Sequence, residues 1–225
     1  MPTGFAILPR VLAPSAIDAL VQAIENAPAA RQRAGRGGVR DLLNRVPAVR
    51  TLSRSLPLRQ LVDPVLGAHA RPVRALLFDK TPAANWKVPW HQDLTLAVQA
   101  RHDLPGYGPW TVKDGIPHVQ PPVAVLENML ALRLHLDDCG EHNGPLRVLP
   151  GTHALGRLAA DEIDELQQSR PAVTCLARRG DVILLRPLLL HASSPAAVPA
   201  RRRVIHIEYA SAVLPQPLCW YEDLA

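Results

Sequence analysis

Two side chains that bind metals lie two residues apart in the segment Trp90-His91-Gln92-Asp93. In an extended strand, residues i and i+2 point to the same face, so His91 and Asp93 can reach one ion. A third candidate, His191, ends the apolar run VILLRPLLLH about a hundred residues later. Two imidazoles and one carboxylate on one face of an octahedron leave three positions open, and this donor set is typical of non-haem Fe(II) sites.

The His-x-Asp spacing has a simpler explanation when it is taken alone. Nine histidines and twenty acidic residues produce such pairs by chance, and a chance pair lies in a surface loop. Cysteines offer no alternative donor set, because Cys139, Cys175 and Cys219 are widely spaced and lack the CxxC or CxxH patterns of zinc and redox sites. We expect three unpaired thiols and a metal held by other ligands.

The elements that must position these ligands change in type near Arg71. Before it, residues 14–27 and 49–67 carry apolar side chains at helical spacing, and Ser15 is the expected N-cap of the first helix. Residues 31–40 are rich in Gly and Arg and predict a loop. After Arg71, short apolar runs separated by Pro, Gly and Asn predict strands; they are RPVRALLFDK, VLENMLALRLHLDD, GPLRVLPGTH, GDVILLRPLLLH and RRVIHIEYASAV.

This order of elements predicts one domain that is mainly β with flanking α-helices. The expected architecture is a double-stranded β-helix, the jelly-roll or cupin-like barrel. We expect residues 1–70 to form a helical N-terminal buttress and 71–210 the jelly-roll core, with one helical insert at 161–169. Residues 94–125, rich in Pro and Gly, are the expected lid insertion, and 211–225 the C-terminal tail.

The composition limits the class of protein. Hydrophobic residues make up 48% of the 225 residues, which is enough for a buried core. The net charge is +5, nearly all of the positively charged residues are arginines, and aromatic residues are only 4% of the chain. Nucleic-acid binding is therefore not expected. No apolar run reaches the length of a membrane span and no signal peptide is recognisable, so we expect a cytoplasmic protein that acts on a small molecule, with its oligomeric state open.

Several motifs in this order resemble the phytanoyl-CoA dioxygenase (PhyH) family of Fe(II)/2-oxoglutarate-dependent oxygenases. They are WHQD at 90–93, LDD at 136–138, NGPLRVLPGTH at 143–153, GDVILLRPLLLHASS at 180–194 and RRVIHIEY at 202–209, with PGTH in place of the usual PGSH. The resemblance implies that His91, Asp93 and His191 hold iron, and that Fe(II), 2-oxoglutarate and O2 are the cofactors. The expected reaction is hydroxylation of a C–H bond with release of succinate and CO2. Because Asp93 is present, halogenation is not expected.

The resemblance also implies how 2-oxoglutarate is bound. Family members place an arginine eleven residues after the distal histidine to pair with the distal carboxylate, which points to Arg202. Arg201 and Arg203 flank it and remain alternatives. A planar guanidinium can hold a carboxylate through two hydrogen bonds. Ser193 resembles the family's hydroxyl that contacts the same carboxylate. Lys80 is a candidate for neutralising the co-substrate or a substrate acid, and the alternative is an exposed lysine.

The substrate pocket is the least determined part of the site. Trp86 and Gln92 adjoin the metal motif, and Tyr107 and Trp110 lie in the predicted lid insertion, so these four are candidates for lining the pocket. An ordered surface loop in which Trp110 is packed for stability is the alternative. Two other functions also remain open. A cupin-like enzyme that uses another divalent metal for hydrolysis or isomerisation would have no use for the arginine. A non-catalytic jelly-roll binding domain would show gaps among the three ligands.

Overall fold

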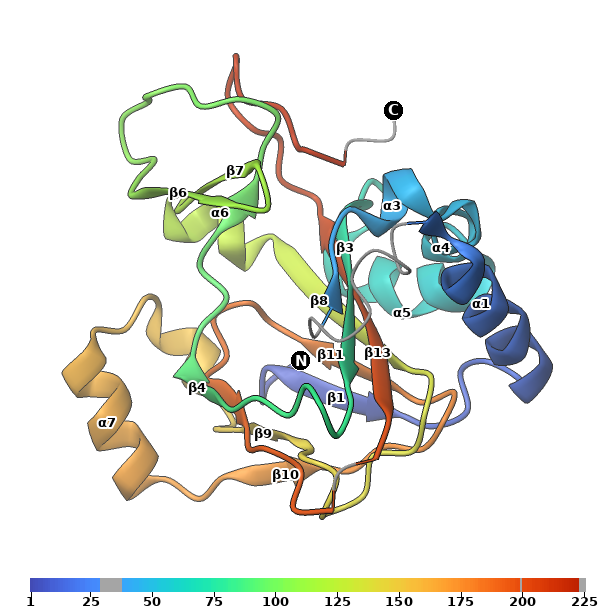
Figure 1. Cartoon of the computed structure of the whole chain (residues 1–225). Coiled ribbons are helices and arrows are strands. Elements are labelled where there is room, and N and C mark those ends of the chain that lie inside the picture. Colours follow the sequence, from blue (N-terminus) through green and yellow to red (C-terminus); the bar gives the residue numbers. More distant parts are fainter. Residues whose placement is uncertain (29–37, 199, 223–225) are drawn as a thin grey trace.

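Two antiparallel sheets form the centre of the molecule (Figure 1). The computed structural model describes residues 1–28, 38–198 and 200–222. The six-stranded sheet has the order β1-β11-β8-β13-β3-β2, with β1 (Phe5–Leu8), β2 (Gly38–Val39), β3 (Arg71–Lys80), β8 (Met129–His135), β11 (Val182–Leu185) and β13 (Arg202–Ala210). The four-stranded sheet has the order β10-β9-β12-β4, with β4 (Val88–His91), β9 (Leu146–Val148), β10 (Val173–Cys175) and β12 (His191–Ser193).

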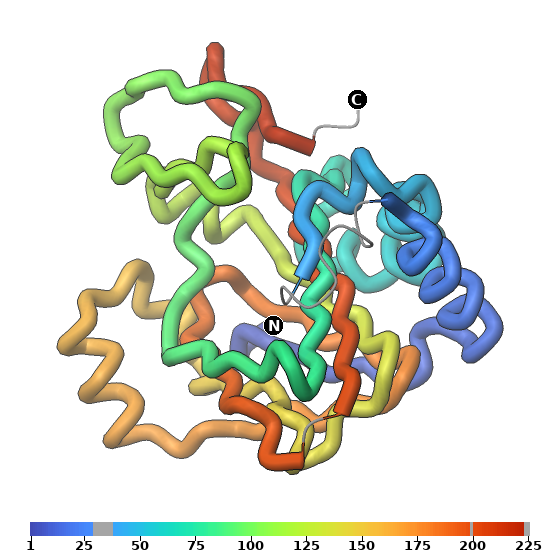
Figure 2. The backbone as a smooth tube through the Cα atoms, in the orientation of Figure 1, coloured from blue at the N-terminus to red at the C-terminus, as the bar shows by residue number. Residues whose placement is uncertain are grey.

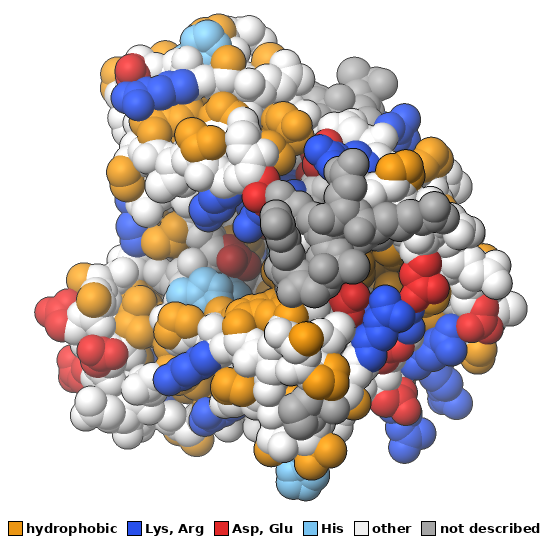
Figure 3. Space-filling model, in the orientation of Figure 1, with side chains coloured by type: hydrophobic (Ala, Val, Ile, Leu, Met, Phe, Trp, Pro, Cys, Tyr) orange, Lys and Arg blue, Asp and Glu red, His pale blue; other side chains and the backbone are white. Residues whose placement is uncertain are grey.

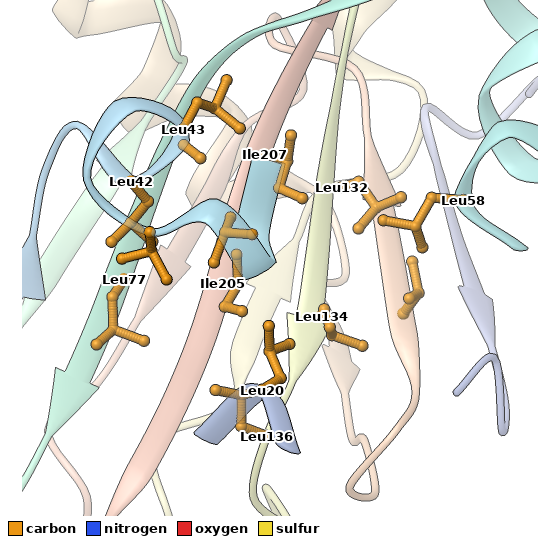
Figure 4. Close-up of a cluster of buried hydrophobic side chains, with 14 of the residues drawn as sticks. Leu20, Leu42, Leu43, Leu58, Leu77, Leu132, Leu134, Leu136, Ile205 and Ile207 are labelled. Atoms are coloured by element: carbon orange, nitrogen blue, oxygen red, sulfur yellow. The ribbon is translucent and has the colours of Figure 1, made fainter. Parts of the chain in front are cut away.

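The larger sheet buries its outer face against helices. These are α1 (Pro14–Asn26), α3 (Leu42–Arg45), α4 (Pro47–Ser53) and α5 (Leu56–Leu66). In β13, Ile205, Ile207 and Tyr209 alternate along the strand and pack into this layer. Leucines from α1, α3 and α5 meet Leu132 and Leu134 of β8 there (Figure 4). The predicted helical buttress therefore covers one face of the sheet, which leaves the opposite face of β13 for the interior of the barrel.

The two sheets pack against each other through a second apolar cluster. It combines Ala131, Ile183 and Leu185 of the larger sheet with Leu146 and Val148 of the smaller one. Two layered antiparallel sheets of this kind are the jelly-roll arrangement, so the predicted fold class is confirmed.

The segment between the metal motif and β8 forms a small sheet of its own. Its order is β5-β7-β6, with β5 (Leu96–Ala97), β6 (Trp110–Lys113) and β7 (Ile116–Val119), and α6 (Val123–Glu127) follows. The C-terminal tail lies beside it (Figure 2), because Tyr221 donates its backbone N–H to Ala97 and Gln99 donates to Cys219. Farther on, Glu222 accepts backbone hydrogen bonds from Leu43 at 2.8 Å and Ala75 at 3.0 Å. The tail thus joins the small sheet to the helices and to β3.

Some local predictions were wrong. The N-terminal segment supplies strands β1 and β2 as well as helices. Ala13, and not Ser15, is the N-cap of α1, because Pro14 already occupies the first turn. The helix expected over 49–67 is divided into α4 and α5, because Ser55 between them is extended and Pro57 lies in the first turn of the new helix.

Other helices match the sequence patterns. The helical insert expected at 161–169 is α7 (Ala160–Ser169), and a 3-10 turn, Thr152–Leu155, precedes it. Most of the loop expected at 31–40 lies outside the described residues. None of the helices in the described ranges is long and apolar enough to cross a membrane.

Candidate metal centre and cavity

Neighbouring strands of the smaller sheet bring the three predicted metal ligands together. His91 ends β4 and His191 begins β12, and the two residues are paired across the antiparallel ladder. The His91 Nε2 atom lies 3.8 Å from Asp93 Oδ1, and His191 Nε2 lies 3.7 Å from Asp93 Oδ2. One donor atom from each of the three residues lies within 4.8 Å of the others. Three donors at this spacing can bind one ion.

The hydrogen bonds of the two imidazoles turn their Nε2 atoms towards that common point. His91 Nδ1 lies 2.8 Å from the Pro89 carbonyl oxygen, and His191 Nδ1 lies 2.9 Å from the Leu189 carbonyl oxygen. A carbonyl only accepts, so each Nδ1 carries the proton and each Nε2 lone pair remains available. Such backbone contacts are the usual means of orienting a ligating histidine. The donor set therefore fits Fe(II).

The electrostatic environment keeps the donors in their ligating protonation states. Burial lowers the pKa of His191 to about 4, so its imidazole is neutral at neutral pH. Burial opposes ionisation of Asp93, but His191, His206 and His91 together hold the pKa of this carboxyl below its ordinary value. A neutral imidazole and an ionised carboxylate are the forms that bind a metal ion.

Gln92 supports the metal ligands from behind and does not face the cavity. Its side chain is 6% exposed and makes three hydrogen bonds. The amide nitrogen donates to Gly156 at 2.8 Å and to Leu188 at 2.7 Å, and the amide oxygen accepts from Leu158 N at 2.9 Å. The prediction that Gln92 lines the substrate pocket does not match this position, because every hydrogen bond ties the metal motif to the backbone of other segments.

We expect Gln92→Ala to lower both stability and metal affinity. Three backbone groups lose their partner, which costs about 1–3 kcal/mol of unfolding free energy. The loss of support for His91 and Asp93 is expected to weaken Fe(II) binding by about tenfold or more. Urea unfolding and anaerobic Fe(II) titration measure the two effects. Gln99→Ala, at an exposed glutamine, is the control; equal effects at the two positions would contradict the supporting role.

The metal-binding group opens into a cavity of about 150 Å³ between the sheets. His91 and Asp93, whose side chains are each 35% exposed, lie towards solvent. At the other end the lining includes Lys80 and Arg202, which are 1% and 3% exposed, and Ser193. The space-filling view shows acidic, basic and histidine side chains gathered in a hollow of the surface (Figure 3). The cavity thus extends from the metal donors at its mouth to buried cations at its end.

The three successive arginines at the start of β13, with Arg201 just before the strand, have separate positions. Arg201 is exposed and pairs with Glu25 at 2.7 Å, while Arg203 makes hydrogen bonds of 2.7 and 2.9 Å to the two carboxylate oxygens of Asp137. Arg202 alone lines the cavity. Its Nη1 donates to the Gly144 carbonyl, and its Nε is buried without a hydrogen-bond partner among the described residues. Strand alternation therefore leaves Arg202 as the arginine that can meet a bound anion.

Lys80 and Ser193 lie beside Arg202. Lys80 is the cross-strand partner of Arg202, and its Nζ lies 3.3 Å from Ser193 Oγ and 3.0 Å from the Ser194 carbonyl oxygen. Trp86 lines the same cavity, with Lys80 Nζ 5.3 Å from its ring centre. The alternative of an exposed lysine is therefore wrong. Burial, followed by repulsion from Arg202, lowers the pKa of Lys80 to about 8.

We expect Lys80→Met to stabilise the protein without bound metal or co-substrate and to weaken 2-oxoglutarate binding. A lysine with a lowered pKa binds fewer protons in the folded state than in the unfolded state, so wild-type stability rises between about pH 8 and the ordinary lysine pKa of 10.5. The variant lacks the part of this rise that Lys80 contributes. Urea unfolding below and above pH 8 measures it, with the exposed Lys87→Met as control. A wild type whose stability falls over this interval would contradict the prediction.

A further row of polar residues was missed by the sequence analysis. Buried Arg133 donates to His206 Nδ1 at 3.4 Å, and His206 Nε2 donates to Glu208 at 3.3 Å. Glu208 in turn pairs with Arg74 at 3.2 Å. Burial, followed by repulsion from Arg202, lowers the pKa of Arg133 to about 10. The signal was available, because Arg133 alternates with leucines along an otherwise apolar strand.

Tyr107 and Trp110 do not take the positions predicted for them. Neither is among the residues that line the cavity. Both pack against the apolar cluster formed by the small sheet and the C-terminal tail, which contains Leu96, Val119 and buried Trp220. The position of Trp110 matches the alternative, in which this side chain is packed for stability.

Solved structures with the same fold cover almost the whole chain. AviO1 from Streptomyces viridochromogenes Tue57 is 27% identical, with a TM-score of 0.68 over 96% of this chain and 94% of that one. EctD from S. alaskensis in its apo form is 20% identical, with a TM-score of 0.73 over 96% of this chain and 76% of that one. HygX from Streptomyces hygroscopicus, with nickel and 2-oxoglutarate bound, gives 18% and 0.66 over 96% and 85%. No curated protein matches the sequence significantly.

The family profile gives the more specific result. The phytanoyl-CoA dioxygenase (PhyH) profile matches residues 2–204, which is most of the chain. This match confirms the resemblance drawn from the motifs. It also supports the expected pair of cofactors, iron and 2-oxoglutarate, for which the His-Asp-His group supplies the donor set. The chain belongs to the phytanoyl-CoA dioxygenase family of non-haem, 2-oxoglutarate-dependent oxygenases.

Proposed function

We propose that this protein is an Fe(II)- and 2-oxoglutarate-dependent dioxygenase that hydroxylates a C–H bond of a small organic substrate and releases succinate and CO2. One observation carries the proposal. The His91, Asp93 and His191 donors face a cavity whose opposite end holds buried Lys80 and Arg202. A metal site alone has no need of such cations, whereas 2-oxoglutarate carries a second carboxylate that they can neutralise.

Each residue of the cavity has a distinct part in this proposal. His91, Asp93 and His191 hold the iron, and the Arg202 guanidinium and the Ser193 hydroxyl bind the distal carboxylate of 2-oxoglutarate, with Lys80 beside them. Bound iron, 2-oxoglutarate and O2 supply the oxidising power, and the protein positions the reactants. The apolar side chains Leu76, Val88 and Leu146 in the wall exclude water from the reacting groups.

The rival functions are less well supported. An enzyme that used another metal for hydrolysis would gain nothing from burying Lys80, Arg133 and Arg202 in one cavity, where their mutual repulsion is costly. A decayed binding domain would be expected to have lost at least one ligand or its support. All three ligands are present, and both imidazoles are oriented for binding.

An anaerobic titration with Fe(II) and then 2-oxoglutarate tests the proposal. We expect the weak visible charge-transfer band that a 2-oxoglutarate complex of Fe(II) gives, and we expect His91→Ala to lose it. His69→Ala, at an exposed histidine, should behave as wild type. If metallated wild type gives no band and binds no 2-oxoglutarate, the oxygenase proposal fails and a barrel enzyme with another metal becomes the better account.

A further inference from the structure

Two basic side chains from different elements form hydrogen bonds with Thr95, and one of them, Arg74, also lines the cavity. Arg74 of β3 directs Nη1 to the Thr95 carbonyl oxygen at 3.5 Å, and Lys113 of β6 donates from Nζ to the Thr95 hydroxyl at 3.3 Å. Thr95 is only two residues beyond Asp93. The convergence therefore lies beside the metal-binding group, on the side away from Lys80 and Arg202.

The position of Arg74 is set by the polar row on the inner face of β13. Its Nη1 lies 3.2 and 3.4 Å from the two carboxylate oxygens of Glu208. The side chains of Arg74 and Glu208 are 11% and 9% exposed, so this ion pair is largely buried. Glu208 also accepts from His206. The carboxylate is thus occupied on both sides and orients Arg74, whose remaining N–H groups have no acceptor in the described part of the chain.

Lys113 reaches this place from the tip of the β6–β7 hairpin. The two turn residues, Asp114 and Gly115, have φ of 56° and 78°. Two successive positive φ values are those of a type I′ hairpin turn, which fixes the register of the strands on either side. Asp114 also pairs with Arg40 at 2.8 Å, on the segment that leads to α3. The turn geometry and the ion pair with Arg40 together fix the hairpin tip, and they fix the position of Lys113 next to it.

Among the described residues, no acidic group forms a direct ion pair with Lys113. Asp93 belongs to the metal-binding group, Glu208 pairs with Arg74, and Asp114 pairs with Arg40. Within the described ranges, the single hydrogen-bond partner of Lys113 is the neutral Thr95 hydroxyl. Burial, followed by repulsion from Arg74 and Arg40, lowers the pKa of Lys113 more than attraction to Asp93 and Glu208 raises it. A half-buried ammonium without a counter-ion costs stability that a bound anion would restore.

We propose that Arg74, Lys113 and Thr95 form a binding site for an anionic group of the substrate, a carboxylate, sulfate or phosphate, next to the metal. This inference rests on the proposed function, because it takes the neighbouring donors to be the reaction centre. The site is separate from the one proposed for 2-oxoglutarate, which uses Lys80 and Arg202. Substrates that carry an acidic group a short distance from the carbon to be hydroxylated fit this arrangement.

Sulfate titration of the Fe(II)- and 2-oxoglutarate-loaded protein tests the site without knowledge of the substrate. At constant ionic strength under anaerobic conditions, calorimetry should show saturable sulfate binding while the visible band persists. Lys113→Gln should weaken binding by about tenfold or more, the usual effect of losing a charge-assisted hydrogen bond. Lys113→Arg should retain most of it. Lys87→Gln, which removes an exposed lysine outside the cavity, should leave it unchanged.

The outcomes separate the two proposals. Absence of the visible band in wild type counts against the proposed function, whereas a normal band with no saturable sulfate binding overturns the anion site alone. Equal sulfate affinity in Lys113→Gln and wild type overturns it as well, as does displacement of 2-oxoglutarate by sulfate. Dimethyl sulfone, a neutral molecule of similar shape, should not bind. Acetate, phosphate and sulfate are titrated in parallel. If one of them binds more tightly than the other two, this supports the site and shows which acid it prefers.

Discussion

His191→Ala is expected to lower the affinity for Fe(II) by more than about 100-fold and to abolish 2-oxoglutarate turnover. Loss of an outer-shell partner alone costs about 10–100-fold in metal affinity or activity, and loss of a ligand costs more. His191 supplies one of the three donor atoms, so its removal leaves only His91 and Asp93 to hold the ion. Anaerobic equilibrium binding of Fe(II) and the release of succinate measure the two effects.

The substitution at His191 needs a control for folding. Its neighbours Leu189 and Leu190 are buried, so thermal unfolding must show that the variant is folded. His69→Ala, which removes an exposed histidine, should match wild type in both assays. If folded His191→Ala bound iron as tightly as wild type, the metal would have to lie elsewhere in the molecule.

Arg202→Ala is expected to raise the dissociation constant for 2-oxoglutarate by at least about 30-fold. Truncating one member of a buried, hydrogen-bonded charge pair costs about 2–5 kcal/mol, and each 1.4 kcal/mol is tenfold in affinity. The Nε of Arg202 has no other partner in the described chain, and the neighbouring ammonium of Lys80 cannot make the same planar contact. Titration of the visible band with 2-oxoglutarate gives the constant directly.

The flanking arginines provide matched controls. Arg201→Ala removes an exposed pair with Glu25 and should change neither stability nor 2-oxoglutarate affinity appreciably. Arg203→Ala breaks the two-bond contact with Asp137, so it should lower stability and leave the dissociation constant as in wild type. A larger loss of 2-oxoglutarate affinity in Arg203→Ala than in Arg202→Ala would show that Arg203, and not Arg202, contacts the carboxylate.

The fold was predictable because strand and helix periods are local. In β13, Ile205, Ile207 and Tyr209 repeat at every second position and pack against the helices, and in α1 the residues at helical spacing, Ile17, Leu20 and Ile24, are buried. The spacing of His91 and Asp93 also suffices to place them on one side of a strand end. His191 can contribute only if its strand, distant in sequence, lies beside β4. The order of motifs indicated this neighbourhood, and the pairing of β12 with β4 confirms it.

Side-chain environments were less predictable, because they depend on segments distant in sequence. Gln92 adjoins two metal ligands, yet its amide is taken up by carbonyl and N–H groups of residues 156–158 and 188. Trp110 lies in a Pro- and Gly-rich segment typical of a lid, but it packs against an apolar cluster that includes residues of the C-terminal tail. The sequence around Lys80 is compatible with an exposed lysine, but in the structure Lys80 is buried opposite Arg202 of β13. Nothing local to these three residues reveals those neighbours.

The order of strands has a consequence for how the protein acquires its structure during synthesis. β1 pairs with β11, and β3 pairs with β13, so strands made early must wait for partners that are made much later. Folds dominated by such distant pairings form slowly, in milliseconds to seconds. The larger sheet can close only after the ribosome has released most of the polypeptide. His91 therefore meets His191 only after β12 has been made, and the metal is expected to be acquired after that point.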